Sequence, residues 1–191
     1  MSELKFSQPL FMIPFSSAQS LQVEPYRRFA SNFELGFSGS SAEIFVQQRK
    51  KEELWISAPD HAFEVDVTVK NPGDSKWLSL EGILDAKDLF AAAQISVLLS
   101  LRSTVTEQFS LVLRILRQDG SFEDVTIGAV TPEADAKYTR VTMTHSLEPL
   151  TSILAEKDVQ ARLILFAPSG KKFNFSLSMF NVFITNMRER S

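Results

Sequence analysis

Residues 63–74, FEVDVTVKNPGD, show the clearest indication of the fold class. The first eight of these residues alternate apolar and polar side chains, and this period of two is typical of a strand with one buried and one exposed face. The last four residues, Asn-Pro-Gly-Asp, are turn formers, so the strand is expected to end there. The stretch therefore predicts a half-exposed strand followed by a tight turn.

The same alternation recurs through most of the chain, in runs near residues 77–84, 93–102, 109–117, 122–127, 138–144, 161–167 and 173–184. A shift of phase after Met179 predicts a bulge in the last strand. Helical spacing is confined to two short segments, residues 85–93 and 146–157. The sequence predicts an all-β fold: a two-sheet antiparallel β-sandwich of jelly-roll type, with about ten strands and one or two short helices.

The length and composition favour one domain. The chain has 191 residues, of which 44% are hydrophobic and 23% are charged, and a β-sandwich of this size commonly forms a single core. Residues 1–30 show the least periodicity and contain three prolines, so we expect an extended N-terminal arm that packs on the domain. Residues 31–191 are expected to form the single β-sandwich domain.

Charge and cysteine content exclude several classes of partner. The net charge is −3, which disfavours nucleic acid because phosphate binding needs clustered lysine and arginine. No apolar run approaches the ~20 residues of a membrane span. The run Leu10–Ile13 is short and lies between Pro9 and Pro14, so we expect no signal peptide. With no cysteine in the chain, a cytoplasmic location is the expectation.

The residues of catalysis are sparse. The only histidines are His61 and His145, and Asp60 would point away from His61 if the two lie on a strand. The chain has no Gly-x-Ser-x-Gly motif and no glycine-rich phosphate loop. Glu64 and Asp66 lie two residues apart on one strand face, and we interpret them as exposed polar alternation. We predict that the protein is not an enzyme and has neither catalytic residues nor a metal site.

The central strands have a second face that is neither plainly polar nor plainly apolar. By parity this face carries Leu98, Val112, Leu116, Ile164 and Phe166, and with them Ser96, Ser100, Ser176, Arg102, Arg114, Arg162 and Asn174. A simple sandwich leaves its outer face polar. Three hypotheses explain the mixture: the N-terminal arm covers the face, a partner subunit covers it, or a ligand binds there. Three further residues are candidates for stacking against a sugar ring, namely Trp55, Trp77 and Tyr138.

Three strands carry a family resemblance: residues 76–80 (KWLSL), 97–102 (VLLSLR) and 161–166 (ARLILF). This pattern resembles β-jelly-roll carbohydrate-binding modules of the galactose-binding-like group, over roughly residues 33–186. The resemblance implies a two-sheet jelly roll that binds saccharides without catalysis. Many such modules hold a structural calcium ion through an Asp in the last strand. The matching position here is Asn181, a neutral residue, which disfavours that ion; no other cofactor is expected.

These observations lead to one preferred function and one alternative. We predict a non-catalytic carbohydrate-binding module that recognises a saccharide on one sheet face. Its ligand-binding residues would be Trp55, Trp77, Arg102, Arg114, Tyr138, Arg162 and Asn174. The alternative is a protein-interaction or assembly module that uses the same apolar and arginine-bearing face for a partner subunit, which would make the chain a homo-oligomer.

Overall fold

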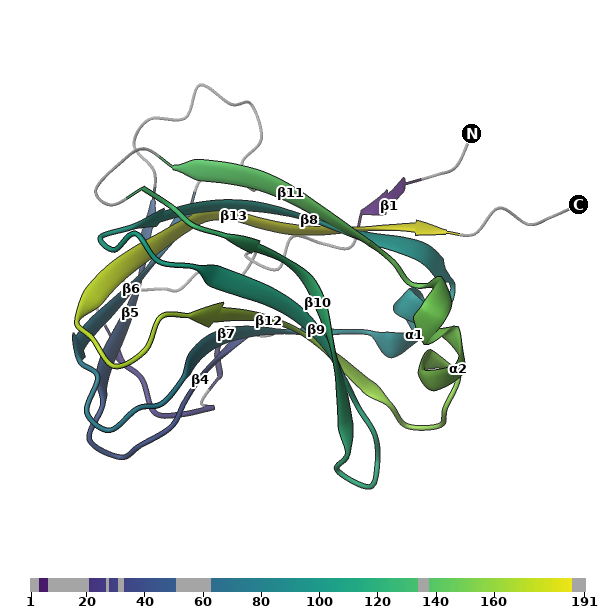
Figure 1. Ribbon diagram of the computed structural model, residues 1–191, viewed down its shortest axis with the longest axis horizontal. Coiled ribbons are helices and arrows are strands. Elements are labelled where there is room, and N and C mark those ends of the chain that lie inside the picture. The colour runs from purple at the N-terminus through teal and green to yellow at the C-terminus, as the bar shows by residue number, and fades with distance from the viewer. Residues whose placement is uncertain are drawn as a thin grey trace, which may run out of the picture.

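The computed structural model describes residues 4–6, 21–26, 28–30, 33–50, 63–133 and 138–186. These residues form two sheets packed face to face (Figure 1). Sheet A has seven strands, in the order β11-β8-β13-β6-β5-β2, with β1 paired to β13. Sheet B has six strands, in the order β10-β9-β12-β7-β4-β3. Every pairing among the described strands is antiparallel, which confirms the predicted β-sandwich of jelly-roll type.

The strands of sheet A are β1 (Leu4–Phe6), β2 (Leu21–Gln22), β5 (Glu43–Lys50), β6 (Phe63–Asn71), β8 (Ala92–Ser103), β11 (Thr139–Ser146) and β13 (Phe173–Asn186). Those of sheet B are β3 (Arg28–Ala30), β4 (Phe33–Phe37), β7 (Leu78–Leu84), β9 (Phe109–Leu116), β10 (Phe122–Val130) and β12 (Gln160–Ala167). Among the described strands, ten have five residues or more, as the sequence predicted.

The core lies between the sheets and is filled by the apolar members of the alternating runs. On β6, Val65, Val67 and Val69 are all buried, while the residues between them face outward. Phenylalanines from both sheets meet in the middle, and the rings of Phe109 and Phe175 lie 5.4 Å apart in an edge-on arrangement. The Phe-rich composition is therefore explained by the core.

Turns and an irregularity also follow the sequence. The predicted turn after β6 is closed by a hydrogen bond from the Ser75 amide to the Pro72 carbonyl, with Gly73 at φ +56°. In β13 the register shifts between Leu177 and Met179, which confirms a bulge close to the predicted position. The bulge keeps apolar side chains pointing into the core on both sides of the shift.

Both expected helical segments are present at one end of the sandwich (Figure 1). The first is α1 (Ala86–Phe90), capped by the Asp85 carboxylate on the Lys87 amide. The second is shorter than expected and consists of a 3₁₀ turn, η2 (Glu148–Leu150), followed by α2 (Thr151–Leu154). Among the described residues no helix is long and apolar enough to cross a membrane.

Three short strands lie in the described parts of residues 1–30, and each pairs with the sandwich. β1 pairs with β13, β2 with β5 and β3 with β4. The division of the chain into an arm and a domain at residue 30 stays a prediction. In Figure 1 both sheets bend in the same sense, with sheet B on the inner side of the arch. The outer faces of the two sheets consequently point away from each other.

Candidate functional site

The outer face of sheet B carries charged residues that the strand register places side by side. Arg114 on β9 lies opposite Asp124 on β10 and opposite Arg162 on β12. Glu81 on β7 lies opposite Glu34 on β4. These residues face outward because their sequence neighbours, Leu113, Leu163, Leu80 and Leu35 among them, are fully buried in the core.

Arg162 joins the two glutamates. Its Nη1 donates to Glu34 Oε2 at 2.8 Å and to Glu81 Oε2 at 3.1 Å. The side chains of Glu34 and Glu81 are only 9% and 5% exposed, whereas that of Arg162 is 22% exposed. Burial opposes the charge of Arg162, but the two carboxylates outweigh it and raise the pKa of the guanidinium. The result is a guanidinium held in one orientation by two largely buried carboxylates.

Arg114 is held in a different way, by a single partner at the surface. Its Nε and Nη2 donate to the two oxygens of Asp124, each at 2.7 Å, which is the bidentate geometry favoured by arginine and carboxylate. This hydrogen bond raises the pKa of Arg114. The guanidinium also lies 4.3 Å from the centre of the Phe122 ring, and Phe122 is 55% exposed.

An aromatic pair lies beside β4 and β7, on the side of this face away from β10. The Tyr26 amide donates to the Leu35 carbonyl of β4 at 2.9 Å, and the Tyr26 ring lies 5.8 Å from the Trp77 ring. Tyr26 is 49% exposed. Partial burial, together with the charge of Glu81, raises the pKa of its phenol.

The absence of a side chain at Gly36 leaves room for the Trp77 ring. A Cβ at Gly36 would lie 2.7 Å from Ser79 Oγ, 2.8 Å from Glu81 Oε1 and 3.0 Å from Trp77 Cζ3. The absent side chain therefore lets the Trp77 ring approach the hydrogen-bonded pair formed by Ser79 and Glu81, whose oxygens are 2.8 Å apart. We call this set of residues the sheet-B face: Tyr26, Glu34, Trp77, Glu81, Arg114, Phe122, Asp124 and Arg162.

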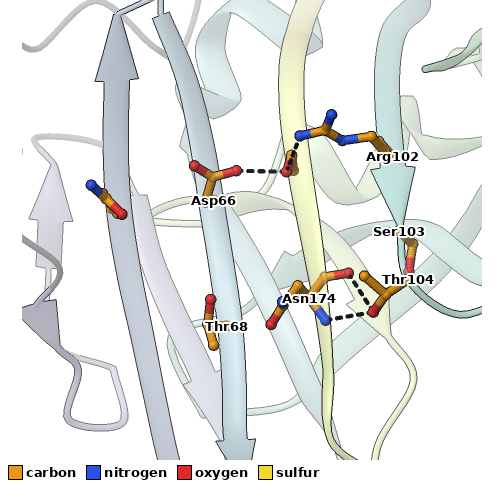
Figure 2. Close-up of a pocket in the computed structure, with 8 residues that line it drawn as sticks. Asp66, Thr68, Arg102, Ser103, Thr104 and Asn174 are labelled. Atoms are coloured by element: carbon orange, nitrogen blue, oxygen red, sulfur yellow. Dashed lines mark hydrogen bonds between the residues drawn. The ribbon is translucent and has the colours of Figure 1, made fainter. Parts of the chain in front are cut away.

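The outer face of sheet A carries a different kind of surface, a polar hollow of about 310 Å³ (Figure 2). Neighbouring strands contribute Gln47, Asp66, Ser176 and Arg102 in one register row. A second row contains Thr68 opposite Asn174. We call this hollow the sheet-A groove, and it is lined by Gln47, Asp66, Thr68, Arg102, Ser103, Thr104, Asn174 and Ser176.

Arg102 is fixed at one end of this groove. Its Nη2 donates to Glu64 Oε1 at 3.0 Å, and its guanidinium carbon lies 5.1 Å from the centre of the Tyr138 ring. Burial and the nearby Glu64 carboxylate raise the pKa of Tyr138. Glu64 and Asp66 thus lie on one face, as the sequence predicted. Glu64 accepts a hydrogen bond from Arg102, and Asp66 accepts one from Ser176 Oγ at 2.6 Å.

The prediction that the three arginines share one sheet is wrong. Arg102 lies with Asn174 and Tyr138 on sheet A, whereas Arg114 and Arg162 lie with Trp77 on sheet B. Parity along a strand tells which side of its own sheet a residue faces, but not which sheet the strand joins. The mixed second face is therefore two outer faces, and Leu98 is separated in the same way from Val112, Leu116, Ile164 and Phe166.

The sequence patterns did not identify several residues of these two outer faces. Glu34 and Glu81 each interrupt an apolar run, FELGF and LSLEGIL, and a lone acid in such a run is a signal of a buried charge that needs a partner. No local pattern indicates that Tyr26 reaches Trp77. Trp55 and His61 lie outside the described residues.

A metal site needs several His, Cys, Asp or Glu side chains close together. Across the described residues, no group of three or more His, Cys, Asp or Glu side chains is arranged to hold a metal ion. Asn181 lies on β13 opposite Leu98. The expectation about calcium stays a prediction.

Comparison with known proteins identifies the fold. No family model matches the chain, and no curated protein matches it. Among solved structures, the chain is similar to the enzymatically active domain of tailspike protein 4 from bacteriophage CBA120, with a TM-score of 0.54 and 10% identity. That similarity covers 81% of this chain, which spans only 19% of the tailspike chain.

Two carbohydrate-binding modules are similar over nearly their whole length. One is the family 11 module from Clostridium thermocellum in complex with a β-1,3-1,4-mixed-linked tetrasaccharide, with a TM-score of 0.50, 11% identity, and coverage of 90% of this chain and 98% of that chain. The other is the CBM22-1 xylan-binding domain from Paenibacillus barcinonensis Xyn10C, with a TM-score of 0.50, 11% identity, and coverage of 80% and 86%. The predicted resemblance to jelly-roll carbohydrate-binding modules is confirmed at the level of the fold.

Proposed function

We propose that this protein is a non-catalytic carbohydrate-binding module and that the sheet-B face holds a neutral oligosaccharide. The observation that carries the proposal is the combination of two exposed rings, Tyr26 and Phe122, with guanidinium groups fixed between them. Ring faces contact the apolar side of a sugar, while fixed polar groups bind its hydroxyls.

The positions of the two rings favour an oligosaccharide. Phe122 lies on β10, and Tyr26 lies beside β4, the fifth strand in the order β10-β9-β12-β7-β4. The backbones of β10 and β4 are four strand spacings apart, roughly 19 Å. The Tyr26 side chain reaches back over the sheet, where the charges of Arg114 and Arg162 act on the pKa of its phenol. The two rings are therefore closer together than their strands, and a short chain of sugar units could touch both.

The charges of the face favour a neutral ligand. Arg114 and Arg162 are outnumbered by Glu34, Glu81 and Asp124, and each arginine is paired with a carboxylate. A phosphate or sulfate would have to compete with carboxylates that are already in place. Hydroxyl groups can instead accept from the remaining guanidinium N–H groups without breaking the ion pairs. Because the two buried glutamates already fix Arg162, little side-chain entropy is lost on binding.

The same contacts argue for binding without bond cleavage. Glycoside hydrolysis needs a carboxylic acid that can donate a proton, and a second carboxylate as base or nucleophile. Glu34 and Glu81 both accept from one guanidinium nitrogen and are largely buried, and Asp124 accepts two hydrogen bonds from Arg114. All three carboxylates of the sheet-B face thus serve as anchors for arginine.

Affinity electrophoresis and calorimetry with neutral polysaccharides test this proposal, beginning with mixed-linked β-glucan and xylan. We expect Tyr26→Ala and Phe122→Ala each to weaken binding about threefold to tenfold, as loss of one stacking contact does. Phe90→Ala is the matched control, because Phe90 is a 44% exposed ring on α1, away from both sheet faces. Binding of no polysaccharide, or equal weakening by Phe90→Ala, would refute the proposal. Release of reducing sugar ends would refute the non-catalytic part.

A further inference from the structure

The sheet-A groove has a chemistry that the sheet-B proposal does not use. All eight residues that line it are polar, and they come from four adjacent strands and the chain that follows β8. Since the groove is on the opposite outer face of the sandwich, one ligand cannot occupy both surfaces at once. From this geometry we infer that the groove is a second binding site, specific for a neutral sugar unit.

The walls of the groove are fixed by their own hydrogen bonds. Ser176 Oγ donates to Asp66 Oδ1 at 2.6 Å and so ties β13 to β6. Thr104 Oγ1 accepts a hydrogen bond from the backbone N–H of Asn174 at 2.9 Å and donates one to the backbone carbonyl of Asn174 at 3.3 Å. These contacts appear as dashed lines in Figure 2. The hydroxyls of Ser176 and Thr104 are therefore used in hydrogen bonds that fix the walls of the groove, and we do not assign them to ligand binding.

Two polar groups remain available inside these walls. The side-chain amide of Asn174 and the hydroxyl of Thr68 make no hydrogen bond within the described part of the chain, and the two residues are register partners on β13 and β6. Figure 2 shows them next to each other, below Asp66 and Arg102. An amide offers both donors and an acceptor, and a hydroxyl offers one donor and two lone pairs. Together they match the vicinal hydroxyls of a sugar.

Charge and size narrow the ligand further. Glu64 and Asp66 outnumber Arg102, and Arg102 is already bound to Glu64, so a phosphate, sulfate or carboxylate ligand is disfavoured. The lining has no apolar side chain to hold a lipid or an aromatic molecule. A volume of about 310 Å³ is at the lower end of the range for small-molecule sites. One or two sugar rings fit this space, in contrast to the oligosaccharide of the sheet-B face.

The inference is tested by NMR titration of the ¹⁵N-labelled protein with a panel of neutral mono- and disaccharides, including glucose, galactose, xylose and cellobiose. We expect at least one sugar to shift the side-chain amide signal of Asn174 and the backbone signal of Thr68. In Asn174→Ala and Thr68→Val the affinity for that sugar should fall about threefold to tenfold, which corresponds to one hydrogen bond. Both variants should fold, because the exposed Asn174 keeps its backbone bonds to Thr104 and Val is similar in shape to Thr.

Tyr26→Ala is the matched control, since it alters only the sheet-B face and should leave the groove signals unchanged. Groove binding that survives Tyr26→Ala supports the inference even if the sheet-B proposal fails. The inference is overturned if no sugar of the panel shifts the groove signals, or if the double variant Asn174→Ala/Thr68→Val binds as tightly as the natural chain.

Discussion

Replacing Arg162 by methionine tests whether the charge network around it is buried enough to matter for stability. The loss of stability should be larger than when the surface ion pair of Arg114 is removed. In the natural chain the Arg162 guanidinium forms ion pairs with both Glu34 and Glu81, whose side chains are 9% and 5% exposed. Arg162 Nη1 donates both hydrogen bonds, so the two carboxylate oxygens that accept them are less than about 6 Å apart. Methionine fills much of the same volume but removes the guanidinium that both of these buried carboxylates accept from.

The expected cost follows from that burial. Removing one member of a buried ion pair typically destabilises a protein by 3–5 kcal/mol, because the remaining charge stays desolvated. Arg162 is itself 22% exposed, so water can reach part of the site, and we expect the lower end, about 3 kcal/mol. Arg114→Met is the matched control, because Arg114 lies directly opposite Arg162 in the register. Its partner Asp124 is 35% exposed, and the loss of such a surface pair costs at most about 1 kcal/mol.

Urea denaturation, extrapolated linearly to water, measures both losses. The triple variant Arg162→Met/Glu34→Gln/Glu81→Gln removes the stranded charges and should recover most of the stability lost in Arg162→Met. An equal or smaller loss of stability in Arg162→Met than in Arg114→Met would contradict a role for the buried charges. A triple variant as unstable as the single one would also contradict it, because the loss would then come from packing rather than from charge.

The chain has two tyrosines, and the pKa of each is raised by burial and by a nearby glutamate; native tyrosinate absorbance should therefore develop at higher pH than in the urea-unfolded protein. Because the folded state keeps its phenolic protons longer, stability should fall as pH rises above about 10, and coinciding titration curves would contradict this. Gly73→Ala should destabilise more than Gly120→Ala in thermal unfolding. Both glycines have positive φ, but a Cβ at Gly73 would lie 2.8 Å from the Ser41 carbonyl carbon, while Gly120 faces open space; equal losses would show that backbone strain alone decides.

Local alternation predicts the strands of this fold well, because burial of one face imposes it residue by residue. The bulge near Met179 was recognisable for the same reason, whereas the turn at Gly73 was recognisable from its turn-forming residues. The partition of strands between sheets was not predictable, because β8 and β12 have the same alternation and differ only in their partners. β8 pairs with β11 and β13, whereas β12 pairs with β7 and β9, and these long-range pairings separate Arg102 from Arg162.

The candidate sites show the same division between local and long-range information. Parity correctly identified outward-facing arginines, but their partners come from far along the chain. Glu34 and Arg162 are 128 residues apart, and Arg102 and Ser176 are 74 apart. A sequence reader can recognise that Glu81 needs a cation because it interrupts an apolar run. Which cation it finds depends on β7 and β12 becoming neighbours.

A buried ion network on an outer sheet face is a weak way to stabilise a sandwich. Apolar residues of similar volume often do as well or better, because an ion pair must first repay the desolvation of both charges. If the triple variant is as stable as the natural chain, the Arg162 network does not serve folding. What it does provide is a guanidinium whose direction is fixed before a ligand arrives, next to the exposed Tyr26 ring. Loss of oligosaccharide binding in that same stable triple variant would assign the network to recognition.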